Sequence, residues 1–198
     1  MSSNSHILRA ATELVHALNK AVDENLPKEI AEIVKFHSAG AAAAGVASGW
    51  VPGFGGLAAA GISAGFIWTM YGRINSKIGL PLSENIVKSV GTGIATNLAA
   101  YFVGGLVVST LLSFIPGVGS VGASIIVGGA CYALTLASGF VYLKLLTNLF
   151  LSGQDPTKMD DASLKEAASR VASSENIKEV ISDAKAEYKP PPKEQQGG

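Results

Sequence analysis

One uncharged stretch, residues 89–143, constrains the fold of this chain more than any other feature. It contains no Asp, Glu, Lys or Arg, and it is interrupted only by a Pro-Gly turn near residues 114–119. Its two halves are about 27 and about 25 residues long. Because a helix of roughly 20 apolar residues crosses the hydrocarbon core of a bilayer, the stretch predicts a hairpin of two membrane-spanning helices.

Charged residues are distributed very unevenly along the chain. The 198 residues include 15 basic and 15 acidic side chains, which gives no net charge. Between residues 36 and 143, however, only Arg73, Lys77, Glu84 and Lys88 are charged. A soluble domain normally has charges throughout its sequence, at roughly a quarter of all residues. The segregation favours a membrane protein with polar ends, and the lack of a strongly basic face argues against a nucleic-acid partner.

A shorter uncharged block, residues 36–72, has the same organisation as the longer one. The two blocks can be aligned at an offset of 64 residues, and each then consists of helix, PGxG turn and helix. Proline ends the first helix and the glycines permit the chain to reverse. We therefore expect two related hairpins packed against each other. The turn residues are Pro52, Gly53, Gly55, Pro116, Gly117 and Gly119.

Small residues recur at helical spacing in the first block. Glycines that are four residues apart form smooth ridges on a helix, which let a second helix approach closely. We expect these ridges to pack the hairpin arms together, with homo-oligomerisation or a pore as the other use of the same surface. The residues concerned are Gly45, Gly49, Gly61 and Gly65.

The expected fold class is all-α, a membrane-embedded helical bundle of two hairpins with amphipathic terminal helices. Ser5 is expected to cap the first helix, Gly79 to end a later one and Ser83 to cap the next. The predicted segments are amphipathic N-terminal helices in 1–35, a hydrophobic membrane domain in 36–151 with hairpins 36–72 and 89–143, an amphipathic segment in 152–188 and a disordered tail in 189–198.

The sequence offers little catalytic chemistry. Residues 117–122 match GxGxxG, but they follow an apolar helical segment rather than a strand, and no acidic residue follows until Asp155. Glu13 and His16 are three apart on the first helix, yet two ligands alone do not form a metal site, and His6 adds no matching pair. We therefore expect a non-enzymatic protein without cofactor or metal.

Residues 70–150 resemble the YcjF-type family of bacterial membrane domains, which are often encoded beside or fused to GTPases. The resemblance is carried by Met-Tyr-Gly-Arg-Ile at 70–74, Gly-Leu-Pro-Leu-Ser at 79–83, Ile-Pro-Gly-Val-Gly at 115–119 and Tyr-Ala-Leu-Thr at 132–135. It implies an all-helical module in the bacterial inner membrane that works with a GTPase or another partner on a separate chain. The basic residues lie in both ends and in the middle loop, which places both termini in the cytoplasm.

These observations favour an integral membrane module or scaffold that binds the lipid bilayer and a protein partner such as a GTPase. Two other interpretations stay open at this point. One is a self-assembling protein that forms a pore or remodels a membrane. The other is a soluble or peripheral helical bundle that buries its apolar hairpins within itself.

Overall fold

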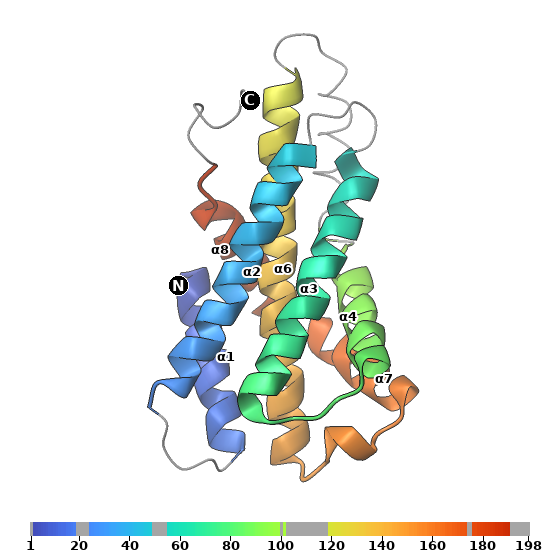
Figure 1. Cartoon of the computed structure of the whole chain (residues 1–198). Helices are drawn as coiled ribbons and strands as arrows, with labels where there is room; N and C mark the ends of the chain where they lie inside the picture. The colour runs from blue at the N-terminus through green and yellow to red at the C-terminus, as the bar shows by residue number, and fades with distance from the viewer. Residues whose placement is uncertain are drawn as a thin grey trace.

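The computed structural model describes residues 2–18, 24–48, 55–99, 101, 119–173 and 176–190. Every regular element in this part of the chain is helical (Figure 1), so the predicted all-α fold class is confirmed. The elements are α1 (Ser3–Ala17), α2 (Leu26–Ser48), α3 (Gly55–Ile78), α4 (Glu84–Ala99), α6 (Gly119–Leu151), a 3-10 turn (Pro156–Lys158), α7 (Asp161–Ala172) and α8 (Asn176–Glu187).

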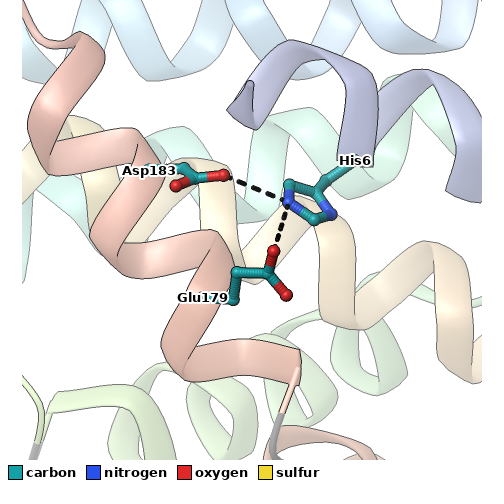
Figure 2. Close-up of side chains that lie close together, drawn as sticks. All are labelled: His6, Glu179 and Asp183. Carbon is teal, nitrogen blue, oxygen red and sulfur yellow. Dashed lines mark hydrogen bonds and ion pairs between the residues drawn. The ribbon is translucent and has the colours of Figure 1, made fainter. Parts of the chain in front are cut away.

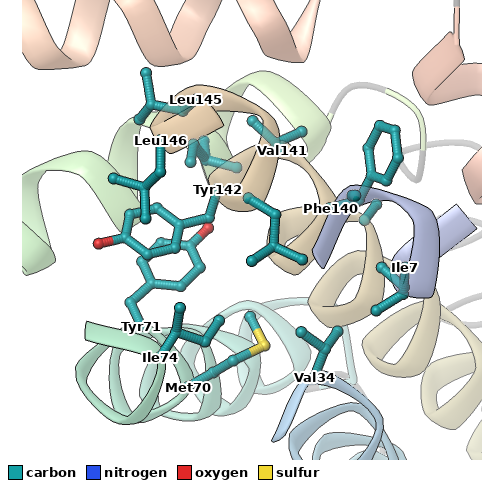
Figure 3. Packing of buried hydrophobic residues seen from close by; sticks show 14 of the residues in the cluster. Ile7, Val34, Met70, Tyr71, Ile74, Phe140, Val141, Tyr142, Leu145 and Leu146 are labelled. Atoms are coloured by element: carbon teal, nitrogen blue, oxygen red, sulfur yellow. The ribbon is translucent and has the colours of Figure 1, made fainter. Parts of the chain in front are cut away.

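Helix α6 lies at the centre of the bundle, and each of the other helices contacts it. Between Thr135 and Thr147 every residue except Lys144 is buried. A helix that is apolar on all sides belongs either in a protein core or in a bilayer. This part of α6 is enclosed by protein, as Figure 3 shows for its contacts with Ile7 of α1, Val34 of α2 and the side chains of α3.

Local sequence signals explain several helix ends. Gly79 follows α3 with a φ of 69°, and the N–H of Leu80 donates to the carbonyl of Asn75 at 2.8 Å, as predicted for a glycine that ends a helix. Ser83 caps α4 through its hydroxyl, which accepts from the N–H of Ile86 at 3.3 Å. Both predictions are confirmed.

The predicted cap of α1 is wrong. The N-cap is Ser2, whose hydroxyl accepts from the N–H of Ser5 at 3.2 Å. Ser5 therefore lies at the third position of the first turn, where it supplies the donor rather than the acceptor. Serine is a preferred N-cap residue, and Ser2, Ser3 and Ser5 all lie near the start of α1. The sequence alone therefore does not show which of them caps the helix.

Helix α2 runs without a break through the predicted segment boundary between residues 35 and 36. From this point to the end of α2 the sequence contains no proline, and its many alanines, which have the highest helix propensity, offset the cost of Gly40 and Gly45. As a result the charged first turns and the uncharged last turns of α2 form one rod. Helix α3 runs back beside it in the opposite direction (Figure 1). The turn between them lies outside the described residues.

Within the described part of the chain, one helical segment is long and apolar enough to cross a membrane. It is Ser124–Leu151 in α6, with a mean hydropathy of 1.7. The most apolar window of this segment is 67% buried inside the protein. Residues 102–118, which would complete the first arm of the second hairpin, lie outside the described residues, so the two-hairpin architecture stays a prediction.

Candidate functional site

Three helix segments at one end of the bundle contain no charged residue. At this end α2, α3 and α6 extend together beyond α1, α4 and α7 (Figure 1). We call residues 38–48 of α2, 55–70 of α3 and 119–132 of α6 the charge-free end, because they include no Asp, Glu, Lys or Arg. The charged helices α1 and α7 pack against the other half of α6, where Glu13 pairs with Lys144 and Arg170 lies near Lys144. The end of α8 reaches the charge-free end, because Glu187 and Lys189 line a pocket with Ala42 and Ala43.

Small residues form the outward surface of the charge-free end where the structure describes it. Ala43 and Ala47 of α2 are exposed, as are Gly61 and Gly65 of α3. Among the described residues, no atom lies within 4 Å of the position that a Cβ would take at Gly61 or Gly65. This part of α3 therefore presents a smooth face with room for another helix or for lipid.

Gly45 has a different environment from those two glycines. A Cβ at Gly45 would lie 2.8 Å from the Sγ of Cys131 and 3.2 Å from the Cα of Gly128. A Cβ at Gly128 would in turn lie 2.5 Å from Cγ2 of Val46. The pair of glycines thus allows the close crossing of α2 and α6 near the charge-free end. Gly49 lies outside the described residues.

The predicted turn residues are only partly covered by the structure. Gly55 is the first residue of α3 and Gly119 the first residue of α6. Both glycines are helical, and each directly follows residues that the structure does not describe. The remaining four turn residues, Pro52, Gly53, Pro116 and Gly117, lie outside the described residues.

A polar cluster joins the two ends of the chain (Figure 2). Nε2 of His6, in α1, lies 3.2 Å from Oδ2 of Asp183 and 3.8 Å from Oε1 of Glu179, both in α8. His6 is 8% exposed, whereas Asp183 is half-buried and Glu179 is exposed. The ring of His6 meets the ring of Phe140 edge-on, with centroids 6.3 Å apart. The imidazole is therefore held between the core and two carboxylates.

The cluster was not predicted from the sequence because His6 and Asp183 are 177 residues apart. One signal was present in the sequence. His6 shares the inward face of its helix with Ala10 and Leu14, which are both buried, so a polar side chain on that face required a partner. The four-residue spacing of Glu179 and Asp183 places both carboxylates on one side of α8.

Further polar contacts hold the charged helices against α6 and against each other. The backbone N–H of Ser3 donates to Oε1 of Glu187 at 2.7 Å, which ties the start of α1 to the end of α8. Lys144, the one charged residue of α6, pairs with Glu13 of α1. Glu13 therefore pairs with Lys144, whereas His16, which lies three residues after Glu13 on the same helix, is exposed to solvent.

An open groove runs between α6 and α7 at the charged end. Its volume is about 620 Å³, and its lining includes Lys144, Asn148, Gln154 and Arg170. Both basic residues are already paired, Lys144 with Glu13 and Arg170 with Glu166 at 2.8 Å. The groove is therefore a mixed polar and apolar surface on which the cations are largely neutralised, rather than a concentrated anion site.

Comparison with known proteins gave no significant match to a family model, to a curated protein or to a solved structure.

Proposed function

We propose that this protein is a non-enzymatic membrane module. In this proposal the charge-free end inserts into a bilayer, while α1, α7 and α8 stay in water and bind a protein partner. The observation that carries the proposal is the segregation of charge along the bundle. Segments of α2, α3 and α6 share one end and contain no charged residue, whereas α1 and α7 lie against the opposite half of α6.

The energetics of side-chain transfer support this orientation. A charged residue at the centre of a membrane helix costs roughly 2.5–3.5 kcal/mol on insertion scales. The charged half of the bundle would therefore be excluded from hydrocarbon, whereas the exposed alanines and glycines of α2 and α3 carry no such cost. Small residues also suit close helix contacts inside a bilayer, where packing replaces the hydrophobic effect as the force between helices.

The arrangement of α1 and α8 bears on topology. Because Ser3 and Glu187 are in contact, the first and last described helices lie on the same side of any bilayer that the charge-free end enters. Together with the positive-inside rule, this supports a cytoplasmic location for both termini. The resemblance to the YcjF-type family adds the bacterial inner membrane as the site and a GTPase as the class of partner.

Extraction of membranes with alkaline carbonate tests the proposal. We expect the full chain to stay in the membrane pellet and to require detergent for release. Ala47→Lys, which places a charge on the exposed face of the charge-free end, should increase the released fraction. Ser173→Lys, at an exposed position after α7, should not. Complete release of the wild-type chain by carbonate would contradict insertion.

The burial of α6 supports a second candidate, a peripheral or soluble helical bundle. In that case the other helices of the protein shield the apolar surface of α6 from water. The chain should then be purified as a monodisperse species without detergent. The exposed face at Gly61 and Gly65 supports a self-assembling variant of the membrane module. That variant predicts dye leakage from liposomes that contain only the pure protein, which a simple scaffold would not cause.

A further inference from the structure

We propose that His6, Glu179 and Asp183 form a binding site for a divalent transition metal of the Zn²⁺ type. The three side chains offer one nitrogen and two carboxylate oxygens, and these three ligand atoms all lie within 4.8 Å of one another. They come from α1 and α8, so a bound ion would link the first helix of the chain to the last (Figure 2). The site is independent of the membrane proposal.

The distances are close to those that a zinc ion requires. Zinc binds imidazole nitrogen and carboxylate oxygen at about 2.0–2.2 Å, so neighbouring ligand atoms in a tetrahedron lie about 3.4 Å apart. Nε2 of His6 lies 3.2 Å from the Asp183 oxygen and 3.8 Å from the Glu179 oxygen. The Glu179 side chain is 55% exposed and has the freedom to close the remaining gap by rotation.

The surroundings hold the histidine in place while leaving one side open. The His6 ring packs edge-on against Phe140, and its side chain is 10% exposed. The contact between Ser3 and Glu187, about one turn along both helices, sets α1 against α8 independently of the cluster. The exposed position of Glu179 leaves access from solvent, where a water molecule would complete the coordination of the ion.

The ligand set distinguishes among metal ions. Imidazole is a typical ligand of zinc and other transition metals, whereas Ca²⁺ and Mg²⁺ prefer six or more oxygen ligands or retain several waters. One histidine and two carboxylates from only two helices do not provide such an oxygen cage. We therefore expect Zn²⁺ to bind more tightly than Ca²⁺.

The alternative site predicted by residue spacing is less suitable. Glu13 and His16 lie on the same helix, but the carboxylate of Glu13 pairs with Lys144 of α6. A metal ion there would have to displace a cation from a half-buried contact. His16 provides a matched control, because it is an exposed histidine on the same helix as His6.

The test is titration of the full-length, tag-free protein with Zn²⁺ in competition with a zinc indicator. We expect one ion per chain in the wild type. His6→Gln and Asp183→Asn should each weaken binding at least about tenfold, since even loss of an outer-sphere partner costs this much at many sites. His16→Gln and Glu187→Gln should bind as the wild type does. Glu187→Gln is the control for the α1–α8 contact itself.

A second measurement separates metal binding from effects on folding. Thermal unfolding followed by circular dichroism should show a Tm that rises with Zn²⁺ in the wild type and both control variants, and that does not respond in Asp183→Asn. Millimolar Ca²⁺ should not reproduce the rise. The proposal is overturned by an absence of saturable binding, by wild-type affinity in His6→Gln and Asp183→Asn, or by loss of binding in His16→Gln.

Discussion

The rings of Tyr71 and Tyr142 stack on each other in the core, with centroids 3.8 Å apart and planes inclined by 11° (Figure 3). The hydroxyl of Tyr71 donates to the carbonyl of Ser138 at 2.9 Å, and that of Tyr142 donates to Oδ1 of Asn75 at 2.7 Å. Both rings are fully buried, so each hydroxyl that leaves water finds a protein acceptor. The pair fixes α3 against α6 below the charge-free end.

Tyr142→Phe should therefore destabilise the protein. The change keeps the stacked ring but leaves the oxygen of Asn75, a residue that is 4% exposed, without its donor. We expect a loss of about 1–2 kcal/mol in the free energy of unfolding, measured by denaturant titration. Tyr188→Phe is the matched control, because that buried hydroxyl has no hydrogen-bond partner among the residues that the structure describes. An equal loss in both variants would contradict the specific role of the Asn75 contact.

Gly128→Ala should also be destabilising, because the new Cβ would lie 2.5 Å from a methyl carbon of Val46 and 3.1 Å from the carbonyl oxygen of Ala42. Separation of α2 from α6 to relieve this overlap should cost about 1–3 kcal/mol. At Gly65 no described atom lies within 4 Å of the Cβ position, so alanine should be neutral or slightly stabilising there. Thermal or denaturant unfolding measures both. If Gly128→Ala and Gly65→Ala have the same free energy of unfolding, the close crossing of α2 and α6 at Gly128 is contradicted.

Glu13→Gln tests the contact between α1 and α6. The Lys144 side chain is 28% exposed and that of Glu13 is 39% exposed, so removal of the carboxylate leaves a partly buried cation without its partner. We expect a loss of about 1–2 kcal/mol. Glu166→Gln removes the partner of Arg170 at a site where both side chains are about 70% exposed, and should cost no more than about 0.5 kcal/mol. Equal losses would indicate that the interhelical pair contributes no more than a surface pair.

The cap of α7 makes a prediction about pH. Hydrogen bonds from the backbone N–H and the hydroxyl of Ser163 lower the pKa of Asp160 below its ordinary value of 3.8. A lowered pKa in the folded state means that the cap stabilises α7 above pH 3.8 and that this stabilisation is lost as the pH falls through the lower value. The carboxyl resonance of Asp160, followed by NMR, should titrate below 3.8. A midpoint at or above 3.8 would contradict the capping role.

Short-range signals in the sequence predicted local structure well. The helical class, the end of α3 at Gly79 and the cap of α4 at Ser83 depend on helix propensity, backbone freedom and capping chemistry, which act over a few residues. Ser2 replaced Ser5 as the cap of α1 because several serines compete there. The continuity of α2 was also missed, since a change in charge does not interrupt a helix that has no proline beyond its first turn.

Long-range relationships could not be derived from spacing alone. The His6 cluster, the Glu13–Lys144 pair and the Tyr71–Tyr142 stack each join helices that are distant in the sequence. The glycines show the same limit, because identical four-residue spacings place Gly45 in a close contact and Gly61 and Gly65 on an open face. Periodicity identifies a smooth face of a helix, but the neighbouring helices determine what that face meets.

The central claim is that the charge-free end enters the bilayer while the opposite end stays in water. It is tested most directly by an environment-sensitive fluorophore on a single introduced cysteine, Ala47→Cys or Ser173→Cys, with the native Cys131, 1% exposed, as the unreactive background. After reconstitution into liposomes, we expect the label at residue 47 to shift to shorter wavelength and to be quenched by spin-labelled lipid. The label at residue 173 should remain open to aqueous iodide. If both labels stay accessible to iodide and neither is quenched by lipid, the membrane account is contradicted and the protein is a peripheral or soluble bundle.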